Sequence, residues 1–288
     1  MNLQDKVEDI WKSLTNSDAS VQDIIRTTIR RTTLKELNSP KNPWFSFLEK
    51  YTQDEFFSKD RVIEHRSPPN ISIIKKFKDK EIREDSNNYG FRCEDIEEKT
   101  KDDFVVVSLG CSFTYGTGID AEDRWSDVLC KKIQETTNLK VKNYNLGLIG
   151  QSNDYIARMV YKTITDLKPD LYCFLFTFRS RLEWVDHNDQ LINILPGLDT
   201  DAFMKITNDG AALYNFNKNF TLIESLCKLH NVPFMYSTID NLIHLNTSSN
   251  KNYIGFVEAD TDAVDNEHPG SNWHKTLAEL FFNRYKKI

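Results

Sequence analysis

Several residue patterns that would define a function class are missing from this chain of 288 residues. The five cysteines are odd in number and none forms a CxxC pair: Cys93, Cys111, Cys130, Cys173 and Cys227. This pattern gives no zinc or redox motif, and reduced thiols in the cytosol are the simplest interpretation. Three histidines are scattered, at His187, His230 and His244, so we expect no metal site. Gly116 and Gly118 match neither phosphate-binding glycine pattern, so no cofactor is expected.

Clustered positive charge and long apolar runs are also missing. The net charge is −6, from 37 basic and 43 acidic residues, which argues against nucleic acid or an anionic membrane as partner. No apolar run is long enough to span a membrane, and residues 1–5 show neither the basic nor the apolar region of a secretory signal. We therefore expect a cytoplasmic protein, whose hydrophobic content of 39% supports a packed core.

The first third of the chain has a different character from the rest. Apolar residues recur at helical spacing within residues 1–37, which predicts two short amphipathic helices, and Pro40 and Pro43 end the pattern. We predict an N-terminal, mostly helical or irregular extension over residues 1–86. Its expected role is to pack on the core or to form a homo-oligomer contact.

Residues 87–288 alternate between strand and helix patterns. Strands are predicted at 104–109, 141–146, 171–176 and 234–238, and helices at 123–136, 154–166, 211–230 and 273–286. The strand at 171–176 is apolar without alternation, which indicates burial on both faces and a parallel sheet. The pattern predicts an α/β sandwich with helices on both faces. Long loops are expected at 179–201 and 246–252.

The turn after the first of these strands is the strongest functional signal. A β-branched run ends at Gly110, and Ser112 follows two residues later, before a helical pattern. Such a turn presents a side chain at the carboxyl edge of a parallel sheet, where open α/β folds bind their ligands. We predict that Ser112 is a nucleophile and that Cys111 points away from the site. The plainer alternative is that Ser112 only caps a helix.

A serine nucleophile needs a base and an acid that orients the base. Asp265 and His268 lie on one short loop, and Pro269 disfavours helical geometry at His268. We expect His268 to take the serine proton while Asp265 holds its tautomer. The backbone N–H groups of Ser112 and Gly150, in turns that bear glycine, are the candidate donors to a developing oxyanion.

The order of these residues resembles the SGNH/GDSL hydrolases. Gly110-Cys111-Ser112 resembles the first block of that family, Gly150 matches its oxyanion glycine, and Asp265-x-x-His268 followed by Pro269-Gly270 matches its last block. The resemblance covers roughly residues 103–288. It implies a flavodoxin-like three-layer sandwich with a parallel sheet, and ester hydrolysis or acyl transfer, frequently on acylated carbohydrates or lipids.

The sequence departs from the family in two places. Cys111 stands where the family usually has aspartate, and the third block, G-x-N-D, is missing after the strand at 171–176. Arg179 stands near the place of the oxyanion asparagine, and we expect it to supply a charged donor there. Arg181 is expected to bind substrate, together with Asn153 and Tyr115. Either arginine could instead bind an anionic substrate such as an acidic sugar, or the site could be degenerate.

These patterns predict a serine esterase that removes a small O-acyl group from a carbohydrate or a related metabolite. An O-acyltransferase that uses the same triad is one alternative, and a non-catalytic binding protein on a degenerate scaffold is the other. The α/β-hydrolase fold fits less well, because Thr114 replaces the second glycine of its G-x-S-x-G turn and Asp265 lies only three residues before His268.

Overall fold

A computed structural model of the chain describes residues 67–77, 80–185, 191–195 and 208–287. The helices expected within residues 1–37, and the oligomer contact assigned to them, lie outside the described residues.

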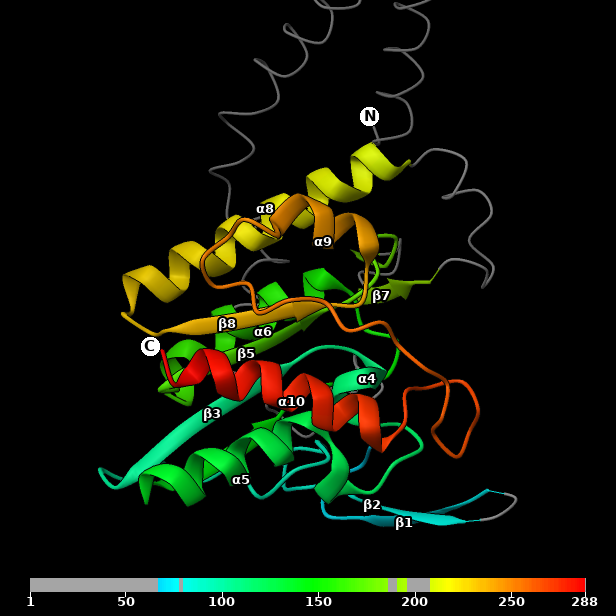
Figure 1. Ribbon diagram of the computed structural model, residues 1–288, viewed down its shortest axis with the longest axis vertical. Coiled ribbons are helices and arrows are strands. Elements are labelled where there is room, and N and C mark those ends of the chain that lie inside the picture. The colour runs from blue at the N-terminus through cyan, green and yellow to red at the C-terminus, as the bar shows by residue number, and fades with distance from the viewer. Residues whose placement is uncertain (1–66, 78–79, 186–190, 196–207, 288) are drawn as a thin grey trace, which may run out of the picture. The chain divides into compact units, whose positions relative to one another are not determined.

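A four-stranded parallel sheet forms the centre of the described unit (Figure 1). Its strands are β3 (Asp103–Leu109), β4 (Lys140–Asn145), β5 (Leu171–Phe176) and β8 (Phe234–Thr238), in the order β4-β3-β5-β8. All six residues of β5 are buried, because helices cover both faces of the sheet. The predicted strands and their parallel arrangement are confirmed.

Helices form the two outer layers (Figure 1). On one face, α5 (Trp125–Thr137) and α10 (Ser271–Tyr285) pack together over Cys173 and Leu175 of β5. Apolar residues of α5 repeat every fourth position at Trp125, Leu129 and Ile133, which places them on one buried stripe.

The other face of the sheet carries an aromatic cluster. Phe174 and Phe176 of β5 pack with Phe216, Phe220 and Tyr236. The covering helices are α6 (Asn153–Asp166) and α8 (Asp209–Leu229), which begin at the side-chain caps Ser152 and Asn208. The protein therefore has the three-layer α/β architecture that the sequence predicts. In chain order its strands run 2-1-3-4, as in flavodoxin-like sheets.

Short elements complete the described unit. They are the antiparallel pair β1 (Ser72–Lys76) and β2 (Glu81–Asp85), α4 (Ser112–Tyr115), the 3₁₀ turn η2 (Ala121–Asp123), the antiparallel pair β6 (Leu182–Val185) and β7 (Leu191–Ile194), and α9 (Asn241–Thr247). Two expectations were wrong: the segment 179–201 contains the β6–β7 hairpin, and the first residues of the expected loop 246–252 belong to α9.

The β1–β2 hairpin precedes the predicted domain start at residue 87, and it contacts the α/β unit. The Tyr115 hydroxyl donates to Glu84 of β2 at 2.9 Å, and Arg92 donates to the Arg83 carbonyl at 3.1 Å. Across the described part of the chain, every helix is too short or too polar to traverse a bilayer.

Candidate active site

Ser112 lies at the carboxyl edge of the sheet, as predicted. It is the first residue of α4, directly beyond the end of β3, and its residue surface is 4% exposed. Cys111 precedes it with extended backbone and is fully buried in the core formed with α5 and α10. The Cys111 thiol therefore packs in the core. Ser112 is the polar residue of this turn, which packs against the loop that carries His268.

Asp265 and His268 form a hydrogen-bonded pair on the loop before α10. Asp265 Oδ2 lies 2.7 Å from His268 Nδ1, and Asp265 Oδ1 accepts the backbone N–H groups of Glu267 and His268, each at 3.1 Å. Burial opposes ionisation of Asp265, but these N–H donors and the imidazole outweigh it and hold its pKa below the ordinary value. An ionised Asp265 accepts from Nδ1–H, which leaves Nε2 as the basic nitrogen of His268.

The serine turn and the histidine loop pack against each other. The ring of Phe113, the residue after Ser112, meets the His268 ring edge to face at 5.6 Å between centroids. The Val264 N–H donates to the Gly118 carbonyl at 3.2 Å. Gly118 has φ +75°, and a Cβ there would lie 3.1 Å from Asp265 Cγ, so this close approach requires glycine. Within the described residues, no hydrogen bond joins Ser112 Oγ to His268.

The turn after β4 lies at the same edge of the sheet. The Leu148 N–H donates to the Gly110 carbonyl at 3.2 Å, which joins this turn to the serine turn. Gly150 has φ +74°, a left-handed conformation that favours glycine. For the backbone N–H groups of Ser112 and Gly150, the described residues provide no hydrogen-bond acceptor. Both N–H groups therefore remain available as hydrogen-bond donors.

Arg179 is held by two carboxylates. Its Nε and Nη2 donate to Asp209 Oδ1 at 3.1 and 2.8 Å, and its Nη1 donates to Asp240 Oδ2 at 2.8 Å. The Arg179 backbone N–H also donates to Asp240 Oδ2, at 3.1 Å. These contacts engage all three nitrogens of the guanidinium within the fold, and we assign Arg179 no oxyanion role.

Tyr115 and Asn153, which the sequence suggested for substrate binding, are engaged within the fold. The buried Tyr115 hydroxyl bonds to Glu84. The Asn153 side chain donates to the Thr177 carbonyl at 3.0 Å and accepts the Thr177 N–H at 2.9 Å. Asn153 therefore positions the backbone just after β5, and we assign neither residue a contact with substrate.

Arg181, in the turn that follows, also contacts Thr177. Its Nη1 donates to Thr177 Oγ1 at 3.1 Å, and its guanidinium lies over the Phe178 ring, 5.0 Å from the centroid. Thr177 lies at the carboxyl edge of the sheet, directly after β5, and the sequence analysis did not single it out. Its signal was its place immediately after the last buried residue of a predicted parallel strand.

Over the described part of the chain, no cluster of three His, Cys, Asp or Glu side chains could hold a metal ion. His274 is buried, and its Nδ1 accepts the Trp125 N–H at 3.2 Å, so this histidine has a structural role.

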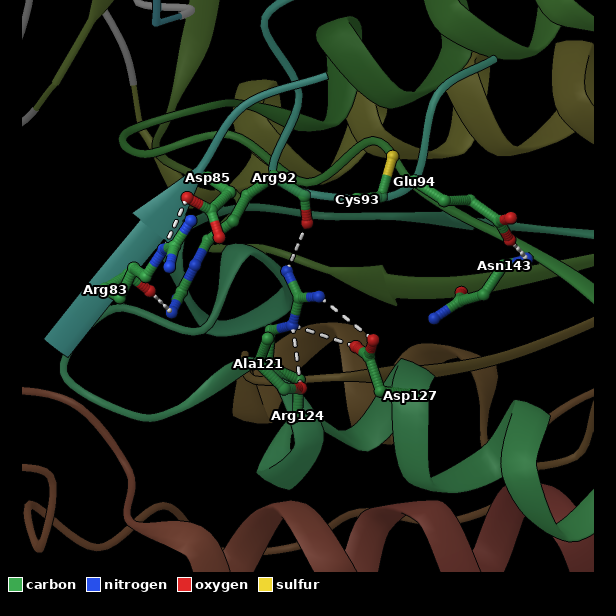
Figure 2. Close-up of a pocket in the computed structure, with 9 residues that line it drawn as sticks. All are labelled: Arg83, Asp85, Arg92, Cys93, Glu94, Ala121, Arg124, Asp127 and Asn143. Carbon is green, nitrogen blue, oxygen red and sulfur yellow. Dashed lines mark hydrogen bonds and ion pairs between the residues drawn. The ribbon is translucent and has the colours of Figure 1, made fainter. Parts of the chain in front are cut away.

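A cavity of about 270 Å³ lies away from Ser112, with different lining residues (Figure 2): Arg83, Asp85, Arg92, Cys93, Glu94, Ala121, Arg124, Asp127 and Asn143. Arg92 is buried there and donates to the carbonyls of Gly116, Ile119 and Arg83 at 2.6, 2.9 and 3.1 Å. Arg124 pairs with Asp127 and donates to the Arg92 carbonyl. These bonds hold the segment after α4 in place.

Comparison with known proteins concerns the fold alone. No protein-family model and no curated protein sequence matches the chain. Several solved structures are similar to it, among them an SGNH-hydrolase family esterase, AlinE4 (11% identity, 48% of this chain, 60% of that chain, TM-score 0.32). They include TesA (13% identity, 64% of this chain, 98% of that chain, TM-score 0.45), a lipolytic protein of the G-D-S-L family from Desulfitobacterium hafniense (14%, 62%, 98%, 0.40) and a family 3 carbohydrate esterase from Clostridium thermocellum (11%, 65%, 96%, 0.38). At these values the likeness supports no argument about substrate.

Proposed function

We propose that this protein is a serine esterase that acts through Ser112, His268 and Asp265. The observation that carries the proposal is the 2.7 Å pair between Asp265 and His268, on a loop whose imidazole packs against the residue next to Ser112. A nucleophile, a base and an acid that orients the base are the three parts that covalent acyl transfer requires.

The proposed reaction forms and then hydrolyses an acyl-enzyme. Ser112 Oγ attacks the ester carbonyl while its proton passes to His268 Nε2, and Asp265 stabilises the imidazolium through Nδ1. The N–H groups of Ser112 and Gly150 receive the charge on the carbonyl oxygen. His268 then protonates the leaving alcohol oxygen, and a water molecule, deprotonated by the same nitrogen, releases the acid and restores the serine.

The proposed substrate is a small O-acyl ester of a carbohydrate or related metabolite. The low exposure of Ser112, 4%, and of the Asp265 and His268 side chains, 14% and 18%, favours a small acyl group. We also propose a cytoplasmic location, which the five free cysteine thiols support.

The rate of ester hydrolysis by variants of the three proposed catalytic residues tests the proposal. We expect Ser112→Ala and His268→Gln each to lower kcat/KM for 4-nitrophenyl acetate by about 10³-fold or more, because each removes an essential part of one catalytic unit. Asp265→Asn should reduce kcat by a smaller factor than removal of the nucleophile or base.

His244→Gln is the matched control, because His244 bonds the Tyr253 hydroxyl from α9 and has no part in the proposed reaction. Its rate should equal that of the wild-type protein. Equal rates for the wild-type protein and His268→Gln would contradict the proposal. An increase in ester consumption when alcohol acceptors are added, with the acyl group recovered on the acceptor, would identify an acyltransferase instead.

A further inference from the structure

We infer that the ester substrate carries a carboxylate or similar anionic group, which binds a subsite formed by Thr177 and Arg181. This inference rests on the proposed function and adds the charge class of its substrate. It comes from the position, the pairing and the support of Arg181.

The subsite lies beside the nucleophile at the carboxyl edge of the sheet. β3 and β5 are parallel neighbours, and Leu109 is level with Phe174. Ser112 and Thr177 each follow those partners by three residues. A Cβ on Gly110 would lie 2.9 Å from the Leu175 carbonyl oxygen, so β5 is still in close contact with the residue that directly follows β3. Arg181 therefore reaches Thr177 next to the turn that presents Ser112.

Arg181 differs in its pairing from three other arginines of the described unit. Each of three others has a carboxylate partner: Arg124 with Asp127, Arg158 with Glu183, and Arg179 with Asp209 and Asp240. Arg181 donates to a hydroxyl group and lies over an aromatic ring, and within the described residues it makes no salt bridge. Its partly buried cation thus retains N–H donors for an anion, and Arg is well suited to bind carboxylates through two parallel hydrogen bonds.

The groups that support this subsite are fixed in place. Asn153 holds both backbone polar groups of Thr177, and the Arg181 N–H donates to the Phe178 carbonyl at 3.1 Å. The following strand, β6, is tied to α6 because Arg158 pairs with Glu183 at 2.6 Å. A preorganised cation costs less entropy on binding than a mobile surface side chain.

Binding measurements on the full chain with Ser112→Ala test the inference without turnover. The probes for titration calorimetry are O-acetylglucose, O-acetylglucuronic acid and the monosuccinyl ester of glucose. The second carries its carboxylate on the sugar and the third carries it on the acyl chain. Comparing these two probes therefore shows which part of the ester bears the anion that binds. We expect one anionic probe to bind tenfold or more tighter than O-acetylglucose, about the gain of one hydrogen bond to a charged group.

Arg181→Gln in the same background should abolish that preference, and Arg181→Lys should retain part of it. Arg83→Gln, which removes an exposed arginine paired with Asp85, should leave it unchanged. Equal affinity for neutral and anionic probes, no measurable binding of either anionic probe, or a preference that survives Arg181→Gln would overturn the inference. Turnover of O-acetylglucose by the wild-type chain is measured separately, so a failure of the esterase proposal is distinguishable from a failure of this one.

Discussion

Two histidines six positions apart, His268 and His274, lie in different surroundings. His268 is partly exposed and bonds to Asp265, whereas His274 is buried beside Arg124 and accepts a backbone N–H from Trp125. Burial, with the nearby positive charge, lowers the pKa of His274 to about 3. An acceptor nitrogen must be unprotonated, so this histidine stays neutral in the folded protein.

The depressed pKa of His274 predicts a pH dependence of stability. The unfolded chain protonates this histidine near pH 6.5, and the folded protein does so only near pH 3. Its contribution to stability is therefore fully present above about pH 6.5 and is lost as the pH falls toward 3, with a slope of at most about 1.4 kcal/mol per pH unit.

His274→Asn keeps an acceptor for the Trp125 N–H but removes the titrating group. Urea denaturation at a series of pH values should therefore give a free energy of unfolding that falls less steeply for the variant between pH 6.5 and 3. Identical slopes for both proteins would show that His274 does not titrate in this way.

Single residues were predictable from sequence where the chemistry is local. Asp265 and His268 are three positions apart, and their pairing depends on one loop. The partners of Arg179 are 30 and 61 positions away, so no local pattern could show that this guanidinium is already paired. The same holds for Asn153, whose bonds to Thr177 span 24 positions.

At the scale of elements, Arg92 joins three segments near the serine turn. It donates to the carbonyls of Gly116 and Ile119, which follow α4, and to the carbonyl of Arg83 in β2, which Figure 2 shows. Arg92 is buried, and its guanidinium donates to each of these carbonyls, while the Gly116 carbonyl also accepts the Ile119 N–H at 3.4 Å.

Loss of Arg92 should therefore destabilise the fold. We expect Arg92→Met to lower the free energy of unfolding by about 2–4 kcal/mol, because it removes the hydrogen bonds that a buried guanidinium donates to three carbonyls. Arg83→Met is the control, since its exposed pair with Asp85 should contribute only about 0–1 kcal/mol. Urea denaturation of both variants provides the measurement, and equal losses would contradict this account of Arg92.

Elements that the sequence predicted well are those with a strong apolar pattern. All six residues of β5 are buried and apolar, β3 buries four apolar residues, and β8 is buried at all five of its positions. The β1–β2 pair was missed because its strands are short and rich in exposed charged residues. The β6–β7 hairpin was missed because each strand has only four residues.

At the scale of the whole described unit, the parallel sheet explains how distant residues meet. The carboxyl ends of β3, β4 and β5 share one edge, so the turns that follow bring Ser112, Gly150 and Thr177 to it. The loop before α10 adds Asp265 and His268 by packing on the serine turn. The parallel sheet was open to prediction from the α/β alternation, whereas the contacts of this last loop depend on the packing of the complete domain.

An activated Ser112 is the central claim of this account, and covalent labelling tests it most directly. The measurement is the intact mass of the purified chain after treatment with a fluorophosphonate, followed by peptide mapping, with Ser112→Ala and His268→Ala treated in parallel. We predict one adduct that maps to Ser112 and is lost in both variants, because the reaction needs the serine and its base. No adduct on the folded wild-type protein, or an adduct that persists in Ser112→Ala, would contradict the claim.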